Sequence, residues 1–298
     1  MAISADQYPP HILVAGCGAL GGAVASALTD IGEVWGIRRT VSAIPQGVHP
    51  APADLLDRPG LARAVPEAPD IILYCLTPST YDDAGYRGAY VDGLANLLAV
   101  TDTRNLKRLL FISSTSVYGQ DDDSEVNELS PVAPRRYSGE RVLQGEKLAL
   151  DSGLPATVIR FSGIYGPGRG RFLESVREGE LNPDSPGPYT NRIHEQDAAD
   201  VCVHLIRQSL AGTELESCYL ASDCEPVRLD DVVDWIRGQI PCQPPRPDGR
   251  RGGRGGSKRC SNRRLLDSGF DFTYPDFRAG YRPMIQALKE GEARKGQG

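Results

Sequence analysis

The sequence of 298 residues lacks the patterns of several protein classes. Its seven cysteines are dispersed, without a C-x-x-C pair or a His/Cys cluster at metal-ligand spacing, so we expect neither a disulfide framework nor a metal site. No apolar run approaches the length of a membrane span, and the first residues, MAISADQYPPH, include no basic, apolar leader. We therefore expect a cytoplasmic protein with no membrane contact.

An excess of positive charge is also missing. The net charge of −6 argues against general attraction to nucleic acid. The exception is the basic, low-complexity stretch PPRPDGRRGGRGGSKRCSNRR, at about 244–264. Arg/Gly tracts can bind RNA, but this one contains no aromatic residue for base stacking. We therefore favour a flexible basic loop over nucleic-acid binding.

A glycine-rich turn joins the first expected strand to the first expected helix. The run HILVAG predicts a strand, and LGGAVASALTDIG has apolar residues at helical spacing. Between them, GCGALG has the G-x-G-x-x-G spacing. The first glycine permits a tight turn, the second lets a pyrophosphate approach the backbone, and the third allows close packing of the helix on the strand. The expected cofactor-binding residues of this turn are Gly16, Gly18, Ala19, Leu20 and Gly21.

The next expected strand, EVWGIRRT, ends in basic residues instead of the acidic residue that usually holds the ribose 2′-hydroxyl of NAD. Arg38 and Arg39 can pair with a 2′-phosphate through charge-assisted hydrogen bonds, so NADP(H) is favoured over NAD(H). The alternative is that both are solvated surface arginines. In the later segment ADLLD, we expect Asp54 to face the adenine edge of the cofactor.

The alternation of strands and helices continues through the first half of the chain. DIILYCLTP, RLLFISSTSVYG and PATVIRFSGIYGPG predict strands, and GAYVDGLANLLAV predicts a helix between the first two. This order predicts an α/β fold with a doubly wound parallel sheet of the Rossmann type, with the ligand at the carboxyl ends of its strands. We expect this domain over residues 1–165, with a strand near 217–222 returning to it, and a smaller substrate-binding domain over 166–298.

Taken in order, these motifs resemble the extended short-chain dehydrogenase/reductase superfamily, in its NAD-dependent epimerase/dehydratase-like branch and an atypical subgroup. The glycine motif, ADLLD, SSTSVYG, RFSGIYGPG and RIHEQDAADV carry the resemblance. It implies an NAD(P)-dependent oxidoreductase that acts on a sugar nucleotide or another small hydroxyl or carbonyl substrate. It also implies that Ser114 binds the reacting oxygen and that Arg192 contacts substrate, with His194 as a further candidate. The alternatives are that Ser114 caps local backbone groups and that His194 is a hydrogen-bonded structural histidine. A homodimer is common among such proteins.

The stretch YSGER bears on catalysis. In the family, a tyrosine transfers the proton, and a lysine one turn later holds the nicotinamide ribose and lowers the pKa of the phenol. Tyr137 and Arg141 have this i, i+4 spacing, which places both on one side of a helix. A cation is needed because an unperturbed tyrosine titrates near pH ~10. Arginine supplies the charge, with a bulkier and differently directed head group. The candidate catalytic residues are Ser114, Tyr137 and Arg141.

A different register is open. The family commonly has a glutamate four residues after the lysine, whereas Glu146 follows Arg141 by five. Aligning on Glu146 puts Ser138 and Val142 at the two catalytic positions. Tyr90 also stands where the family usually has an asparagine. These departures motivate an alternative function, a catalytically impaired NADP(H)-binding regulatory or sensor protein.

Overall fold

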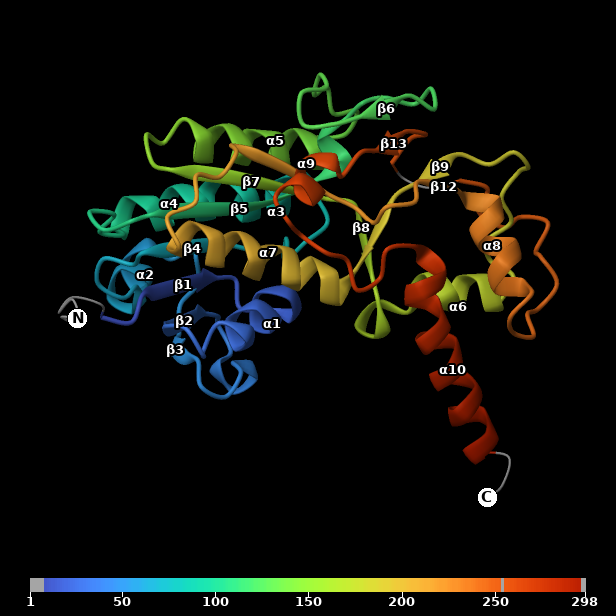
Figure 1. Cartoon of the computed structure of the whole chain (residues 1–298), viewed down its shortest axis with the longest axis horizontal. Helices are drawn as coiled ribbons and strands as arrows, with labels where there is room; N and C mark the ends of the chain where they lie inside the picture. Colours follow the sequence, from blue (N-terminus) through green and yellow to red (C-terminus); the bar gives the residue numbers. More distant parts are fainter. Residues whose placement is uncertain (1–7, 253–254, 296–298) are drawn as a thin grey trace. The chain divides into compact units, whose positions relative to one another are not determined.

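The computed structural model describes residues 8–252 and 255–295 (Figure 1). A seven-stranded parallel sheet has the order β11-β7-β5-β4-β1-β2-β3, which confirms the predicted fold class. Its strands are β1 (His11–Ala15), β2 (Glu33–Ile37), β3 (His49–Ala51), β4 (Ile71–Tyr74), β5 (Arg108–Ser114), β7 (Ala156–Phe161) and β11 (Cys218–Ala221).

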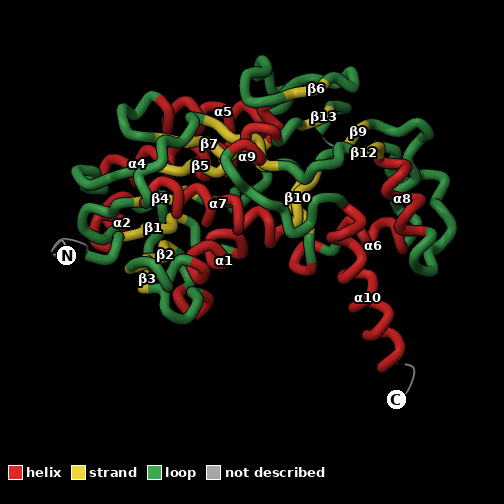
Figure 2. The backbone as a smooth tube through the Cα atoms, viewed as in Figure 1, coloured by secondary structure: helices red, strands yellow, loops and turns green. Residues whose placement is uncertain are grey.

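The helices between these strands cover both faces of the sheet, as the alternation of red and yellow segments in Figure 2 shows. They are α1 (Ala19–Ala27), α2 (Arg58–Ala64), α3 (Asp83–Arg87), α4 (Gly93–Val100) and α5 (Tyr137–Leu150), with short turns η1 (Val41–Ala43), η2 (Gly88–Asp92) and η3 (Thr115–Val117). The strand order reverses between β1 and β4. Because crossovers between parallel strands are right-handed as a rule, this reversal puts α1 on one face and α2, α4 and α5, which contact one another, on the other. This reversal is where doubly wound sheets bind ligands.

The chain forms two compact units and passes between them several times. Unit 1 holds the chain up to Val117, with Pro134–Arg160 and Ala199–Tyr219; unit 2 holds Tyr118–Ala133, Phe161–Ala198 and the chain from Leu220. The remaining elements are β6 (Glu125–Val126), β8 (Gly163–Tyr165), η4 (Pro167–Arg169), α6 (Arg171–Arg177), β9 (Tyr189–Thr190), β10 (Arg192–His194), α7 (Glu195–Leu210), β12 (Val227–Arg228), α8 (Leu229–Arg237), β13 (Arg259–Cys260), α9 (Arg263–Asp267) and α10 (Phe277–Lys295).

Each unit has its own apolar core. In unit 1, buried aliphatic and aromatic side chains of the central strands pack against α4 and α5, with Tyr74 and Phe111 stacked at 5.7 Å between ring centres. In unit 2, apolar residues of α6, α8 and α10 form a second cluster around Phe277 and Ile236. No described helix is both long and apolar enough to span a membrane.

The basic segment expected to be a flexible loop is held at several points in its described part. Arg246 lies 3.8 Å from Glu180, and Arg251 lies 2.6 Å from Asp184. Arg259, at the start of β13, belongs to a strand that pairs in parallel with β6. Residues 253–254 lie outside the described chain. Because carboxylates of unit 2 already pair with two of its arginines, less of this charge is available to an external polyanion.

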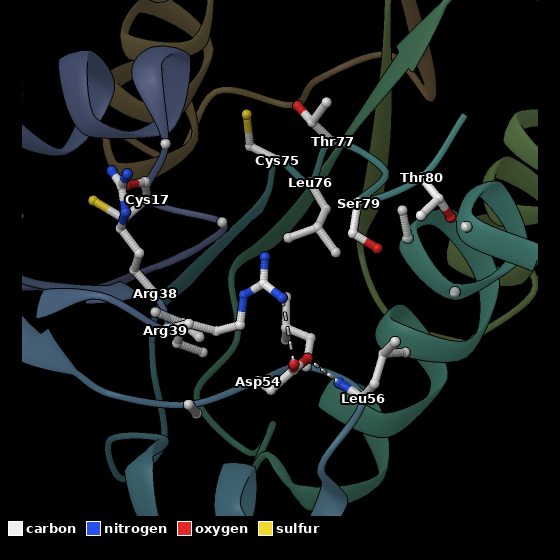
Figure 3. Close-up of a pocket in the computed structure, with 18 of the residues that line it drawn as sticks. Cys17, Arg38, Arg39, Asp54, Leu56, Cys75, Leu76, Thr77, Ser79 and Thr80 are labelled. Carbon is white, nitrogen blue, oxygen red and sulfur yellow. Dashed lines mark hydrogen bonds and ion pairs between the residues drawn. The ribbon is translucent and has the colours of Figure 1, made fainter. Parts of the chain in front are cut away.

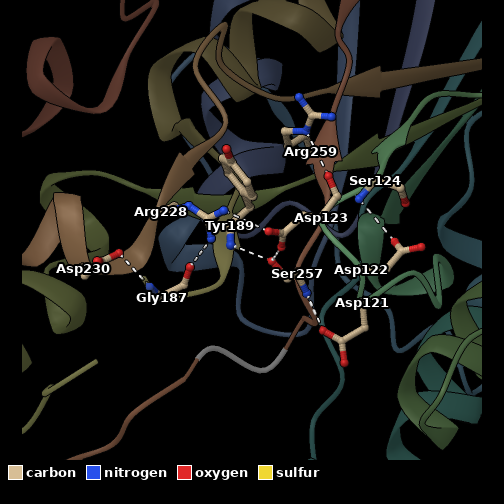
Figure 4. A network of polar contacts seen from close by, with 10 residues as sticks. All are labelled: Asp121, Asp122, Asp123, Ser124, Gly187, Tyr189, Arg228, Asp230, Ser257 and Arg259. Atoms are coloured by element: carbon tan, nitrogen blue, oxygen red, sulfur yellow. Dashed lines mark hydrogen bonds and ion pairs between the residues drawn. The ribbon is translucent and has the colours of Figure 1, made fainter. Parts of the chain in front are cut away.

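A polar network fastens the end of this segment (Figure 4). The Ser257 hydroxyl donates to Asp123, whose other carboxylate oxygen accepts from Arg228 at 2.9 Å. The Arg228 guanidinium also lies over the ring of Tyr189, 4.3 Å from its centre. Asp123 has a φ of 61°, a left-handed conformation that costs a non-glycine residue free energy, so these contacts hold a strained turn.

A buried ion pair connects α5 to the sheet. Glu146 accepts from Arg160 at 2.9 Å and 2.7 Å, one bond to each carboxylate oxygen, and also from the Ser113 hydroxyl. Glu146 and Arg160 are only 2% and 7% exposed. A buried charge is costly without its partner, so this pair sets the rotation of α5 against β5 and β7.

We expect Glu146→Ala to lower the free energy of unfolding by about 3 kcal/mol, because the buried guanidinium loses its bidentate carboxylate. The exposed neighbour Lys147 offers a matched control. Lys147→Ala should change the free energy of unfolding by less than about 0.5 kcal/mol. Urea denaturation followed by circular dichroism measures both. Equal losses in the two variants would show that the pair does not fix the helix.

Candidate cofactor-binding site

The first and third glycines of the turn after β1 are required by the fold itself. Gly16 has a φ of +101°, and a Cβ atom there would lie 2.2 Å from the carbonyl oxygen of Cys75, at the end of β4. A Cβ atom on Gly21 would lie 2.3 Å from the carbonyl oxygen of Gly16. Any side chain at either position would therefore push β1, β4 and α1 apart.

Gly18 differs from the other two. It is exposed, it precedes the first residue of α1, and a Cβ atom there would meet no other described atom within 4 Å. Packing therefore does not require glycine at this position. The free space lies at the N-terminal end of α1, where backbone N–H groups and the helix dipole favour an anion. The geometry fits the pyrophosphate of a dinucleotide, which needs close approach to the backbone.

A pocket opens beside this turn, at the carboxyl ends of β1, β2 and β4 (Figure 3). All of its lining residues belong to unit 1. Its lining includes Gly16 and Gly18 of the turn together with Arg38, Arg39 and Asp54. The structure thus gathers the residues expected from three separate motifs. Ala19 and Leu20 begin α1 and do not line the pocket, and Gly21 packs beneath the turn.

The two arginines after β2 have different surroundings. Arg38 is half-buried and donates from Nη1 to the carbonyl of Cys17 at 3.0 Å, so it braces the glycine turn. The side chain of Arg39 is 70% exposed, and its Nη1 lies 3.9 Å from a carboxylate oxygen of Asp54. Asp54 in turn accepts from the backbone N–H of Leu56 at 2.9 Å. Arg39 extends across the pocket in Figure 3, with most of its donors available to an anionic ligand.

Another wall of the pocket follows β4 and was missed in the sequence. Its lining residues include Cys75, Leu76, Thr77, Ser79 and Thr80, and the wall continues through α3 to Ala89. The available signal was the position of DIILYCLTPST. Its strand pairs with β1 at the reversal of strand order, so its carboxyl end had to face the glycine turn.

Ser114 lies at the end of β5, as expected. It is half-buried, and its Oγ accepts from the backbone N–H of Ser116 at 3.1 Å. This local bond is the capping role that a strand-end serine often has. Ser114 does not line the described pocket. Its function in binding a substrate oxygen stays a prediction.

Tyr137 and Arg141 face the start of α3, and each has a partner there: Tyr81 precedes the helix and Asp83 is its first residue. The Tyr137 hydroxyl donates to the carbonyl of Tyr81 at 2.7 Å. Arg141 makes two bonds of 2.8 Å to the carboxylate of Asp83 and a third, of 2.9 Å, to Gln144. The guanidinium charge is therefore largely balanced by Asp83. The catalytic role of this pair stays a prediction.

The alternative alignment, which is anchored on Glu146, corresponds to the face of α5 that packs against the sheet. Glu146 is buried against Ser113 and Arg160, and Val142, one turn before it, is 2% exposed. Ser138, a further turn back, lies on the same side of the helix. The face that carries Glu146 therefore presents Ser138 and Val142, neither of which is an ionisable proton donor at neutral pH.

The candidate substrate residues lie inside unit 2. Arg192 and His194, both in β10, are 6% and 4% exposed. Arg192 donates to the Thr190 hydroxyl at 2.6 Å, and the His194 ring lies 3.8 Å from the ring of Tyr274, centre to centre. Burial lowers the pKa of His194, so the ring is neutral at physiological pH. Their substrate contacts stay a prediction that this buried setting does not favour.

Further buried polar groups surround β10. Arg192 Nη1 and His194 Nε2 have no hydrogen-bond partner in the described part of the chain, and the same holds for Ser162 Oγ, Tyr165 Oη and Asp223 Oδ2. Burial raises the pKa of Asp223 well above its usual range, although Arg192 opposes the shift. Within residues 8–252 and 255–295, no three His, Cys, Asp or Glu side chains gather as a metal site.

Comparison with known proteins agrees with this fold and turn. The model of the NAD dependent epimerase/dehydratase family matches residues 12–218. The chain belongs to this family. The structure of a Methylobacillus flagellatus protein, described as a candidate NAD-dependent epimerase/dehydratase, is 36% identical. It superimposes with a TM-score of 0.80 over 95% of this chain and 100% of that one.

Two curated relatives have lower identity. Protein YeeZ of Escherichia coli is 29% identical over 210 residues, which cover 67% of this chain and 68% of that protein. The 3-diazoavenalumate denitrifying reductase of a Streptomyces species is 26% identical over 258 residues, which cover 79% and 83%.

The three glycines should respond differently to alanine. Gly18→Ala should keep the free energy of unfolding within about 1 kcal/mol of the parent, because the fold leaves room for the methyl group. It should weaken dinucleotide binding at least about tenfold, because the methyl group fills space that the pyrophosphate needs. Gly16→Ala and Gly21→Ala should each destabilise the protein by about 2 kcal/mol or more.

Thermal melts and fluorescence titration with NADPH separate these effects. Unchanged binding by a stable Gly18→Ala variant would contradict the assignment of this turn to the pyrophosphate.

Proposed function

We propose that the protein is an NADP(H)-preferring oxidoreductase that acts on a small hydroxyl or carbonyl compound, with a sugar nucleotide as one such class. The open space at Gly18, beside a pocket that contains Arg38 and Arg39, is the observation that carries the proposal. When bound, the nicotinamide supplies hydride transfer to or from a substrate carbon. The Streptomyces relative, named as a reductase, supports this reaction class.

The preference for the 2′-phosphate rests on charge. The pocket side that follows β2 carries two guanidinium groups, and only one carboxylate, Asp54, lies next to them. Arg38 already donates a hydrogen bond to the backbone of the glycine turn, whereas Arg39 is mostly exposed. Arg39 is therefore the better partner for a phosphate, and Arg38 supports the turn that receives the pyrophosphate.

Arg39→Ala should raise the dissociation constant of NADPH about fivefold to tenfold and that of NADH less than about twofold, because only NADPH carries the 2′-phosphate. Arg104→Ala is a matched control, since Arg104 is similarly exposed, pairs with Asp102 and lies outside the pocket lining. Fluorescence titration at low and moderate salt measures both. Equal losses for the two nucleotides, or no preference in the parent protein, would refute the phosphate contact.

Proton transfer in this proposal is assigned to Ser114 and Tyr137. Both are hydroxyl groups near the start of α5, where Gly139 packs against the backbone of Ser116 in η3. For Tyr137 to reach a substrate, its bond to the Tyr81 carbonyl would have to be exchanged for one to the substrate oxygen. Tyr137 is 42% exposed, and its ring meets the ring of Tyr86 edge to face, 5.8 Å between centres, so the exchange would also alter this contact.

A second function is favoured by the surroundings of α5: an NADP(H)-binding protein without enzyme-like turnover, which regulates a partner. Arg141 forms an ion pair with Asp83. The buried face of α5 that carries Glu146 also carries Ser138 and Val142. Neither arrangement supplies the phenol and free cation of the family. The proposed cofactor site of unit 1 does not depend on that phenol and cation, so both proposed functions use the same cofactor site.

Tyr137→Phe distinguishes the two functions. If the protein is an oxidoreductase, this change should lower kcat at least about a hundredfold on any accepted carbonyl substrate, because the proton donor is lost. NADPH affinity should fall by no more than about threefold. NADPH oxidation against aldehydes, ketones and keto-sugar nucleotides provides the assay. An active parent whose kcat is unchanged by the substitution contradicts the role of Tyr137, and a parent without turnover on the whole panel favours the regulatory function.

A further inference from the structure

One wall of the cofactor pocket is a short segment with little stability of its own. Residues 79–89 supply this wall, through Ser79, Thr80, Ala84, Gly85, Gly88 and Ala89. Its helix, α3, has five residues, too few to be stable in isolation. The segment is mostly exposed up to Ala84. Its position therefore depends on contacts with the rest of unit 1.

Hydrogen bonds within the segment fix its conformation but not its position against the rest of unit 1. Asp82 begins α3 by accepting from the backbone N–H of Gly85 at 2.7 Å and from the Thr80 hydroxyl at 3.0 Å. Gly85 packs closely on this turn, since a Cβ atom there would lie 2.2 Å from the carbonyl oxygen of Thr80. These contacts all lie within the segment, so they fix its conformation only.

The contacts that place the segment come from β4 and α5. At its far end, the buried hydroxyl of Tyr74 donates to the carbonyl of Ala89 at 2.6 Å. At its near end, Arg141 grips Asp83 with two bonds of 2.8 Å, and the Tyr137 hydroxyl donates to the Tyr81 carbonyl.

The Asp83–Arg141 pair is well suited to hold a wall. Its two parallel bonds fix both distance and direction, unlike a single contact between flexible side chains. The Arg141 side chain is 25% exposed and is also held by Gln144 on its own helix, while Asp83 is 52% exposed. The hydrogen bonds from Arg141 keep the pKa of Asp83 below its usual range, so the carboxylate stays charged at neutral pH.

The geometry points to Arg141 as a positioning residue that acts through Asp83 to hold the 79–89 wall in the shape that admits the cofactor. This role rests on the proposed cofactor site and is independent of turnover. It differs from the role of the family's lysine, which contacts the nicotinamide ribose directly. A direct contact would depend on Arg141 alone, whereas the positioning role depends equally on both members of the pair.

The experiment compares Asp83→Asn, Arg141→Gln, their combination and the charge-reversed pair Asp83→Arg/Arg141→Asp in the full chain. The probe is NADPH, followed by fluorescence titration. Each single variant should bind about threefold to fivefold more weakly. The combined neutral variant should be no worse than either single one, because both remove the same interaction. The charge-reversed pair should recover to within about twofold of the parent.

Arg207→Gln is the matched control. Arg207 also makes a two-bond ion pair in unit 1, at 3.0 Å from both oxygens of Asp30, away from the pocket lining. Its loss should leave NADPH affinity unchanged. Melting temperatures within a few degrees of the parent confirm that the variants fold.

Hydrogen exchange separates failure of this inference from failure of the cofactor site. In protein without cofactor, amides of residues 79–89 should exchange faster in Asp83→Asn and in Arg141→Gln than in the parent or Arg207→Gln. If the parent does not bind NADPH, the proposed function fails, while this readout still tests the wall. Unchanged exchange in both variants overturns the inference. Weaker binding in Arg141→Gln alone, without rescue by charge reversal, also overturns it, because Arg141 would then act directly.

Discussion

The cofactor site depends on one close approach of backbones. At Gly16, β1 turns with a positive φ, so near to the end of β4 that a Cβ atom would overlap the carbonyl of Cys75. Gly21 then lets α1 pack on that turn. The remaining glycine of the motif, Gly18, has open space beside it and is exposed at the start of the helix, in the same pocket as the arginines that follow β2. Packing thus accounts for Gly16 and Gly21 but not for Gly18, whose open space is the basis of the proposed pyrophosphate contact.

The rotation of helix α5 about its axis is a second constraint, because it decides which side chains contact the sheet and which contact α3. One face is fixed by the buried pair of Glu146 and Arg160, which ties the helix to the sheet. With this rotation, Tyr137 and Arg141 face the start of α3, where the Tyr81 carbonyl and the Asp83 carboxylate hold them. The residues that resemble a catalytic pair in the sequence are thus connected to a wall of the cofactor pocket. In the proposed proton transfer, the Tyr137 hydroxyl would have to leave the Tyr81 carbonyl.

The sequence predicts best what local chemistry decides. The glycine spacing and the apolar strands give the doubly wound sheet, and position at strand ends brings Arg38, Arg39 and Asp54 to one pocket. The part of the wall at 81–89 could not be found this way, because its contact with α5 joins Asp83 to a residue 58 positions later. The ion pairs of the basic segment near residue 250 could not be predicted either, because they too join residues that are far apart in the sequence. Its carboxylate partners in unit 2 lie far away in the chain.

A crystal structure of the protein with NADP+ tests the central claim most directly. The account predicts the pyrophosphate against the backbone N–H groups at Gly18, and the 2′-phosphate within hydrogen-bonding distance of the Arg39 guanidinium. A cofactor whose 2′-phosphate points to solvent, away from both arginines, would contradict the NADP(H) preference. A crystal soaked or grown at saturating NADP+ with no nucleotide in this pocket would contradict the cofactor site itself.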